Sequence, residues 1–275
     1  MRNCVRIPIA ASFFLLALPV FAQPGAPKPP EGPAPRLNGK PDLSGLWQRP
    51  YVPDMTVTTP DGKTQVADPS LPNDPATENM KGRNGQALPP RKVLPFTEWG
   101  KAQWESYDAA KGDYTGSCLP FGLMRSMNSP DPIQIMQSDQ YLSLLYEQNT
   151  WFKVFPLDGR KHRDIVPTWF GDSVGHWEGD TLVVDTVNFN GKTRLDTTGH
   201  PHSDQIRIVE RFQRTDLGHV AYEVTVNDPK TFTRPWKNTR VFTLRPDWEI
   251  MEYSCEENNK DFLEGHIKGG VNPGK

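Results

Sequence analysis

Histidines and carboxylates within this sequence supply the side chains that acid/base chemistry needs. The candidates are His162, His202, Glu210 and Glu223, because an imidazole held beside a carboxylate can move a proton near neutral pH. Glu210 and Glu223 fall in runs where polar and apolar residues alternate. If their row faces inward, it forms a polar floor under an apolar cavity, where burial raises a carboxyl pKa. If the row faces outward, it forms ordinary ion pairs on a wet face.

Aromatic residues exceed what a plain strand face requires, and some of them are expected to line a pocket. An antiparallel barrel of about eight strands encloses just enough room for one small ligand. Arginines beside turns or on the same strands can add polar contacts at its rim. The expected ligand-binding residues are therefore Trp151, Trp177, Tyr222, Trp236, Arg160 and Arg211.

Two motifs suggest other chemistry, and their contexts argue against both. His200-Pro-His202 can place two imidazoles on one side of an extended chain, but the acidic ligand of a cupin-type metal site is missing three and four residues later. Gly171-Asp-Ser-Val-Gly175 matches the string of a serine nucleophile elbow, which needs a strand before it and a helix after it. A Gly-Asp hairpin follows instead. The sequence therefore predicts neither a metal, nor a cofactor, nor a serine hydrolase.

Residues 1–22 are typical of a removable export signal. Arg2 and Arg6 precede an apolar run, and Val20-Phe-Ala22 suits a cleavage site. We therefore expect a periplasmic or secreted protein with no membrane-spanning segment after the signal is removed. Cys118 and Cys255 are the cysteines outside the signal, and an oxidising compartment favours a bond between them. We expect this disulfide to tie the first edge of the sheet to its last strand.

Length and charge limit the classes of function. The chain has 275 residues and a formal charge of −2, which becomes −4 once the two signal arginines leave. No basic block is present in the mature part, so a nucleic-acid partner is not expected. The 22 glycines and 28 prolines imply many turns and loops and argue against a helical bundle.

The positioning elements follow in order along the chain. Residues 23–41 contain seven prolines and suit an extended tether, and residues 42–117 read as a loop-rich wrapping segment with one helix at 97–111. A β domain is expected at 118–262 and a tail at 263–275. Its strands are expected at 141–149, 151–156, 173–178, 181–189, 205–215, 219–227, 239–244 and 248–255. Consecutive hairpins with no helical crossover predict a mainly β antiparallel meander of about eight strands that closes into a lipocalin-like barrel, with a β-sandwich as the alternative.

Several segments resemble a family of exported bacterial proteins of unassigned function. They are Cys118-x-Pro120, Trp177-Glu-Gly-Asp-Thr-Leu-Val-Val184, Gly199-His-Pro-His-Ser203 and Glu210-Arg-Phe-x-Arg214. The resemblance covers roughly residues 118–259 and implies a secreted or periplasmic, mostly β protein. Gly45-Leu-Trp47 is also similar to the Gly-x-Trp that opens the first strand of lipocalins.

Three functions remain open from the sequence. The first is an exported barrel that binds a small apolar or aromatic molecule. The second is a metal-independent acid/base enzyme, a lyase, isomerase or hydratase, on the same barrel. The third is a structural or partner-binding protein of the cell envelope, suggested by the Pro-rich tether. The sequence leaves the ligand's identity and the oligomeric state open.

Overall fold

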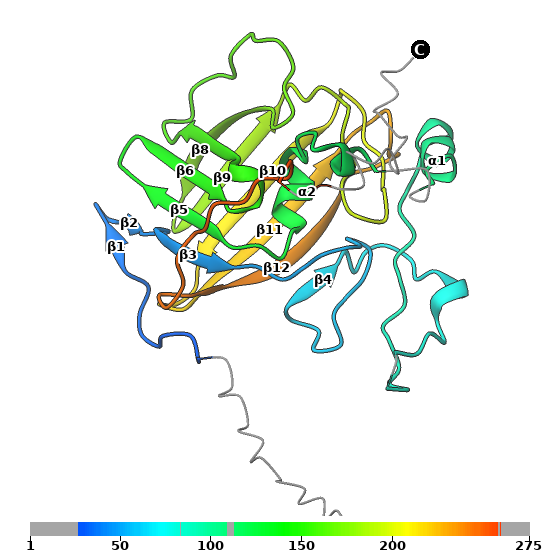
Figure 1. Cartoon of the computed structure of the whole chain (residues 1–275), viewed down its shortest axis with the longest axis horizontal. Coiled ribbons are helices and arrows are strands. Elements are labelled where there is room, and N and C mark those ends of the chain that lie inside the picture. The colour runs from blue at the N-terminus through cyan, green and yellow to red at the C-terminus, as the bar shows by residue number, and fades with distance from the viewer. Residues whose placement is uncertain (1–26, 83, 109–112, 258, 260–275) are drawn as a thin grey trace, which may run out of the picture.

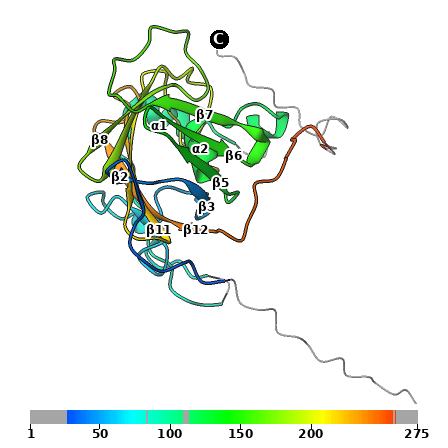
Figure 2. The ribbon, with the colours of Figure 1, turned by 90° about the vertical axis from the view of Figure 1, so that its left-hand side faces the viewer.

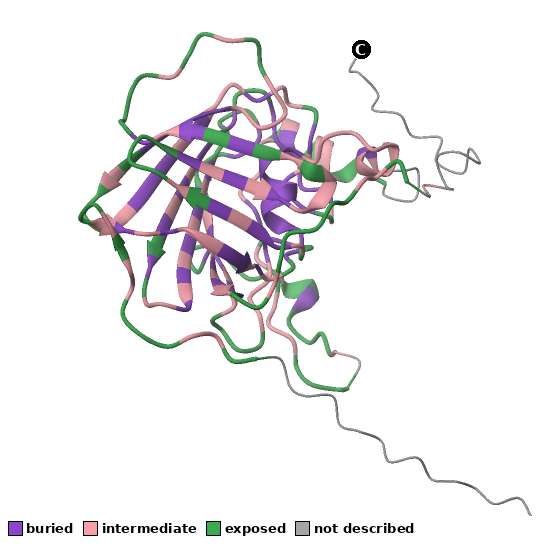
Figure 3. Ribbon diagram, turned by 60° about the vertical axis from the view of Figure 1, so that its left-hand side comes forward, coloured by how far each residue is buried: buried purple, intermediate pink, exposed green. Residues whose placement is uncertain are grey.

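The computed structural model describes residues 27–82, 84–108, 113–257 and 259, and its architecture is mainly β, as the sequence predicts. Buried and more exposed residues alternate along most strands (Figure 3), because successive side chains point to opposite faces of a sheet. The strands are β1 Arg36–Leu37, β2 Lys40–Pro41, β3 Gly45–Gln48, β4 Gln65–Ala67, β5 Ile133–Gln137, β6 Tyr141–Tyr146, β7 Phe152–Pro156, β8 Asp172–Glu178, β9 Thr181–Val187, β10 Arg207–Arg214, β11 His219–Asn227 and β12 Trp236–Leu244.

One antiparallel sheet forms the body of the protein (Figure 1). Its strands follow the order β7-β6-β5-β3-β12-β11-β10-β9-β8, and β4 pairs with a second stretch of β12. The sheet contains two runs of hairpins, β5 to β7 and β8 to β12, and β3 joins them. Trp47 of β3 pairs with Leu244 of β12 on one side and with Ile133 of β5 on the other. The barrel therefore includes a strand from residues 42–117, outside the β domain expected at 118–262, at the Gly45-Leu-Trp47 motif that is similar to the start of the first lipocalin strand.

The sheet is nearly closed into a barrel with one seam, which excludes the sandwich alternative. β7 and β8 are the two ends of the strand order and lie side by side (Figure 2). Side chains span this seam inside the barrel. Lys153 Nζ of β7 donates to Glu210 Oε2 of β10 at 3.0 Å and to Thr186 Oγ1 of β9 at 3.3 Å.

In the described part of the chain, two α-helices accompany the barrel, α1 Glu98–Glu105 and α2 Gly122–Asn128. The 3-10 turns described there are η1 Pro75–Thr77, η3 Tyr114–Ser117 and η4 Gln148–Thr150. Thr97 caps α1 as expected, its hydroxyl accepting from the Gly100 N–H at 3.0 Å. The helix ends at Glu105 instead of residue 111, because Tyr107 leaves the helical path and donates to Asp113 Oδ2. Residues 109–111 of the expected helix lie outside the described residues.

The helix α2 was not expected from the sequence, since it has no side-chain cap and spans seven residues. Every one of its residues is buried, so tertiary packing rather than helix propensity sustains it. Its Met127 contacts the barrel wall, where the Tyr146 hydroxyl lies 3.5 Å from the Met127 sulfur and Arg240 Nη1 donates to the Met127 carbonyl. Together with the rings of Trp47, Tyr222 and Phe242, α2 occupies space within the curve of the sheet.

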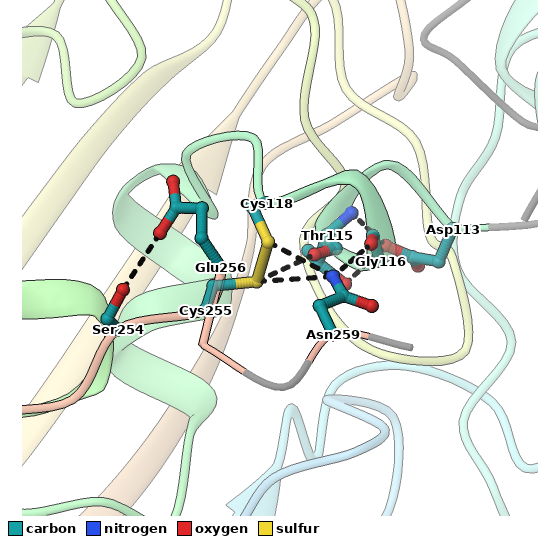
Figure 4. The surroundings of a disulfide bond; sticks show 8 residues. All are labelled: Asp113, Thr115, Gly116, Cys118, Ser254, Cys255, Glu256 and Asn259. Carbon is teal, nitrogen blue, oxygen red and sulfur yellow. Dashed lines mark hydrogen bonds between the residues drawn. A yellow bond between two sulfur atoms is a disulfide. The ribbon is translucent and has the colours of Figure 1, made fainter. Parts of the chain in front are cut away.

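The expected disulfide between Cys118 and Cys255 is present, with the two Cα atoms 5.5 Å apart (Figure 4). Its expected role in closing the sheet is wrong. Cys118 follows η3, and Cys255 lies in an irregular segment beyond β12, so neither cysteine belongs to a strand of the seam. The bond instead fastens the end of the described chain to η3, where Asn259 Nδ2 also donates to the Gly116 carbonyl at 3.0 Å.

Seven of the eight predicted strands lie within a few residues of the observed bounds, and the eighth is wrong. Residues 248–255 form no strand. The Met251 N–H donates to a side-chain oxygen of Glu147 instead of to a backbone ladder, and β3 and β4 already pair with the available edge of β12. The strand β5 was missed, although Gln134 lies between two buried isoleucines there, Ile133 and Ile135. The expected signal at 1–22 and tail at 263–275 lie outside the described residues.

Among the helices that the structure describes, none combines the length and apolar character needed to cross a bilayer.

Candidate functional site

A groove of about 730 Å³ lies between α1, the loop segment that precedes it, and the loop joining β9 to β10. Its size falls within the range of small-molecule sites. Aromatic, cationic and acidic side chains line it together. They are Asp54, Thr56, Asp74, Arg91, Lys92, Val93, Leu94, Phe96, Lys101, Trp104, Glu105, Thr198 and His200.

The helix α1 is fixed against the turn between β11 and β12. The Thr97 N–H donates to the Thr231 carbonyl at 2.9 Å, and Gly100 lies so close to this carbonyl that a Cβ there would meet its oxygen at 2.1 Å. Lys230 of this turn has its Nζ 4.8 Å from the centre of the Trp99 ring of α1. Trp104 of α1 lines the groove, and Trp99 is not among the lining residues.

The loop after β9 is organised around Asp196, whose side chain is fully buried. Its carboxylate accepts from the backbone N–H groups of Met55 and His200, from the Thr198 hydroxyl, and from His200 Nδ1 at 2.6 Å. Gly199 has a φ of +92°, and a Cβ there would lie 2.1 Å from the Tyr107 ring. The sequence Asp-Thr-Thr-Gly-His therefore folds into a turn that holds an imidazole at the groove.

His200 is stacked face to face on Trp104, with ring centres 4.3 Å apart and an interplanar angle of 12°. Burial acts to lower the pKa of His200, but attraction to Asp196 and the hydrogen bond between them prevail, so the pKa is raised. Burial acts to raise the pKa of Asp196, and the same interaction with His200 leaves it lowered. The two groups therefore stabilise one another in their charged forms.

The second ring nitrogen of His200 is the one available to a bound molecule. Nδ1 is engaged by Asp196, and within the described chain Nε2 makes no hydrogen bond. His200 is 5% exposed and lines the groove. A carboxylate behind one imidazole nitrogen fixes the orientation of the ring and leaves the other nitrogen free to donate or accept a proton.

Arg91 and Asp54 form an ion pair in the same groove, with Asp54 close to His200. Arg91 Nε lies 3.0 Å from Asp54 Oδ2, and the other oxygen of Asp54 accepts from the N–H and hydroxyl of Thr56. The Asp54 side chain is 7% exposed, whereas that of Arg91 is 46% exposed and reaches toward solvent. The pair thus fixes the position of a guanidinium group within reach of a ligand.

Asp54, Asp196 and His200 bring possible metal-binding atoms within 4.8 Å of one another. A metal ion on the free Nε2 would face away from Asp196, because Asp196 is bonded to Nδ1. A metal ion on the carboxylate of Asp196 would have to displace hydrogen bonds from four protein donors. The arrangement therefore fits an Asp-His pair that shares a proton better than it fits a metal centre.

The four residues expected to act in catalysis lie in separate places. Glu210 is inside the barrel, where it accepts from Lys153 and from the Tyr222 hydroxyl at 3.0 Å each. Glu223 is on the outer face, where Lys237 Nζ donates to it at 3.1 Å. Glu210 therefore fits the inward interpretation and Glu223 the outward one.

The two histidines of that set have other partners. His162 lies between Asp172 and Asp185, at 3.2 and 3.0 Å. His202 is buried, 2.6 Å from the Thr193 hydroxyl, and burial lowers its pKa. Within the described chain, the hydrogen bonds of the four residues join none of them to another, so the expected His-carboxylate pair does not form among them.

The six expected ligand-binding residues are also dispersed. Tyr222 and Trp236 are buried in the core, Trp151 packs against Phe170, and Trp177 lies on β8 beneath Lys40. Arg160 pairs with Asp158 on the surface, and Arg211 pairs with Glu178. Of these six, Arg211 and Tyr222 line one cavity together with Glu223, a hollow of about 360 Å³ lined largely by residues on the outer face of the sheet.

Sequence reasoning missed the groove for two reasons. Arg91 belongs to a segment with no periodic pattern, and Trp104 was not singled out in the helix expected at 97–111. His200 was considered as a metal ligand with His202, but the useful signal was Asp196, four residues before it. Comparison of this chain with family models, curated proteins and solved structures found no match.

Proposed function

We propose that this chain is an exported β-barrel protein that binds a small, partly aromatic molecule in the groove beside α1. The observation that carries the proposal is the stacked pair of Trp104 and His200 in a groove of about 730 Å³. An exposed ring edge or face next to a fixed hydrogen-bonding atom is a common way to hold a planar ligand.

The sequence placed the ligand inside the barrel, and the groove is the better location. α2 and large rings occupy the curve of the sheet, including Trp47, Trp236 and Phe242, all at most 2% exposed. The groove instead offers Phe96 and Trp104 as apolar surface, with His200 Nε2 and Arg91 as polar contacts. These groups suit a planar molecule with a hydrogen-bonding or anionic substituent.

A thermal-shift screen tests the proposal. The mature protein is screened against aromatic acids, sterols, sugars and metal ions, since a ligand that binds only the folded state raises its melting temperature. We expect aromatic compounds to give a saturable increase in the wild type. Trp104→Ala should need about tenfold more compound for the same increase, and the matched variant Trp99→Ala on the same helix should respond like the wild type. A saturable response limited to sugars or metal ions contradicts the proposal.

A second function, acid/base catalysis in the same groove, is favoured by the free Nε2 of His200 with Asp196 behind it. Nε2 would accept a proton from an acidic C–H of the bound molecule, and the protonated ring would return a proton to the carbanion. Incubation with phenylacetone in D₂O tests this step by NMR, because deuterium from solvent then replaces the C–H hydrogen. Exchange should be faster with wild type than with His200→Gln, and equal rates contradict this function.

A further inference from the structure

Two arginines, Arg49 and Arg240, are buried inside the protein at 2% and 1% exposure. Arg49 follows β3, and Arg240 is an inward residue of β12. Both reach the same residue of α2. Arg49 Nη1 lies 3.9 Å from the Met127 sulfur, and Arg240 Nη1 donates to the Met127 carbonyl at 3.1 Å. Two positive charges are therefore held close together away from water.

The partners of these two guanidinium groups are uncharged. Arg49 donates to the carbonyls of Ser126 and Asp131, and Arg240 donates to the side-chain oxygen of Asn238 as well as to Met127. Each guanidinium also lies near a tyrosine ring, Arg49 at 5.7 Å from Tyr146 and Arg240 at 5.6 Å from Tyr222. Within the described residues, neither arginine forms an ion pair with a carboxylate.

The nearby acidic groups are already engaged elsewhere. Glu210 accepts from Lys153, which is itself a buried cation, and from Tyr222. The Asp131 carboxylate accepts from the Ser129 hydroxyl. Three buried cations therefore lie in one region: Arg49, Arg240 and Lys153. Among the described residues, the buried carboxylate that forms an ion pair with one of them is Glu210, and its partner is Lys153.

Two nitrogens of this cluster, Arg49 Nε and Arg240 Nη2, have no hydrogen-bond partner among the residues that the structure describes. An unpaired buried donor destabilises the folded state, and more so when the group is charged. Burial lowers the pKa of each arginine to about 10, so both remain positively charged at neutral pH. An anion close to both guanidinium groups would satisfy the free donors and offset the repulsion between the two charges.

We propose that Arg49 and Arg240 form a binding site for a small oxyanion at α2, separate from the groove beside α1. Guanidinium groups match carboxylate, sulfate and phosphate oxygens in geometry. Sulfate is the probe for the test, because it offers several such oxygens and does not titrate near neutral pH. The site does not depend on the function proposed for the groove.

The experiment measures sulfate retained by the folded protein. Protein loaded with sulfate is exchanged into a Tris-gluconate buffer and unfolded by heat, and ion chromatography measures the sulfate released. Wild type should release about one sulfate per chain, and Arg240→Met and Arg49→Met should release at least tenfold less. Arg207→Met, which removes an exposed arginine of β10 paired with Asp185, should match wild type.

Melting temperatures provide the second measurement, at constant ionic strength with sulfate in place of gluconate. Sulfate stabilises most proteins weakly by exclusion from their surface. The proposal predicts an additional saturable increase in wild type and Arg207→Met that is absent from Arg240→Met. If either buried variant fails to fold, the amount of sulfate released from wild type still shows whether the protein holds the anion. No sulfate above background, or equal release from wild type and a folded Arg240→Met, overturns the site and shows that water alone meets the free donors.

Discussion

The ion pair between Lys153 and Glu210 is expected to hold the barrel closed at its seam. The side chains are 5% and 0% exposed, and their atoms lie 3.0 Å apart. Lys153→Met leaves a carboxylate buried inside the barrel with only the Tyr222 hydroxyl as a partner. Removal of one member of a buried pair costs about 3–5 kcal/mol, so the free energy of unfolding should fall by about 4 kcal/mol.

A matched pair on the same barrel provides the control. Lys237 and Glu223 lie 3.1 Å apart, but their side chains are 45% and 30% exposed. An exposed pair contributes about 0–1 kcal/mol, so Lys237→Met should lower the free energy of unfolding by less than about 1 kcal/mol. The nitrogen–oxygen distance is nearly equal in the two ion pairs, so the comparison measures how burial changes the contribution of a pair to the free energy of unfolding.

Urea unfolding followed by tryptophan fluorescence provides the assay, with a double-mutant cycle for each pair. Glu210→Gln preserves the shape of the side chain and removes its charge. The double variant Lys153→Met/Glu210→Gln should lose less stability than the sum of the single variants, by about 2 kcal/mol. Additive losses, or a Lys153→Met loss no greater than that of Lys237→Met, would refute the idea that this pair closes the seam.

Three further predictions concern other parts of the structure. The 137-residue separation of Cys118 and Cys255 implies that the disulfide stabilises the folded state by about 5 kcal/mol. Cys255→Ser should lower the unfolding midpoint in urea as much as the double serine variant does, while the strand signal in far-UV circular dichroism is kept. A loss of strand signal would show that the bond holds the sheet. Gly45→Ala should cost about 2 kcal/mol in urea unfolding, because φ is +145° and the new Cβ would lie 2.6 Å from Leu244; an unchanged midpoint counts against this packing. Asp196 raises the folded-state pKa of His200 against the effect of burial, so the stability that protonated His200 contributes is complete below about pH 6.5 and is lost as pH rises through the folded pKa. The free energy of unfolding between pH 6 and 9 should therefore fall more steeply in wild type than in His200→Gln. Equal slopes would show that the pair does not form.

The sequence predicted the barrel well because local patterns define hairpins. Gly179-Asp180 and Asp216-Leu217-Gly218 mark turns, and the strands on either side alternate between apolar and polar residues. The role of β3 was harder to predict. Its position between β5 and β12 depends on pairing between segments that lie far apart in the chain.

The groove could not be predicted from the sequence because its parts come from segments distant from one another. Asp54 and Arg91 lie in irregular chain, and only the folded structure brings Trp104 onto His200. The sequence left open whether Glu210 faces inward or outward. In the structure it faces inward, and its partner Lys153 comes from a strand across the seam. A pattern with a period of two shows which face a residue occupies, and it does not show which residue lies opposite across a barrel.

Binding of an aromatic compound in the groove is tested most directly by isothermal titration of the strongest compound from the thermal-shift screen. Wild type and Trp99→Ala should bind one molecule per chain with the same dissociation constant. Trp104→Ala should bind about tenfold more weakly, since an aromatic contact contributes about 0.5–1.5 kcal/mol beyond the area it buries. Equal affinity for all three proteins, or no aromatic compound that binds at all, contradicts the proposed function.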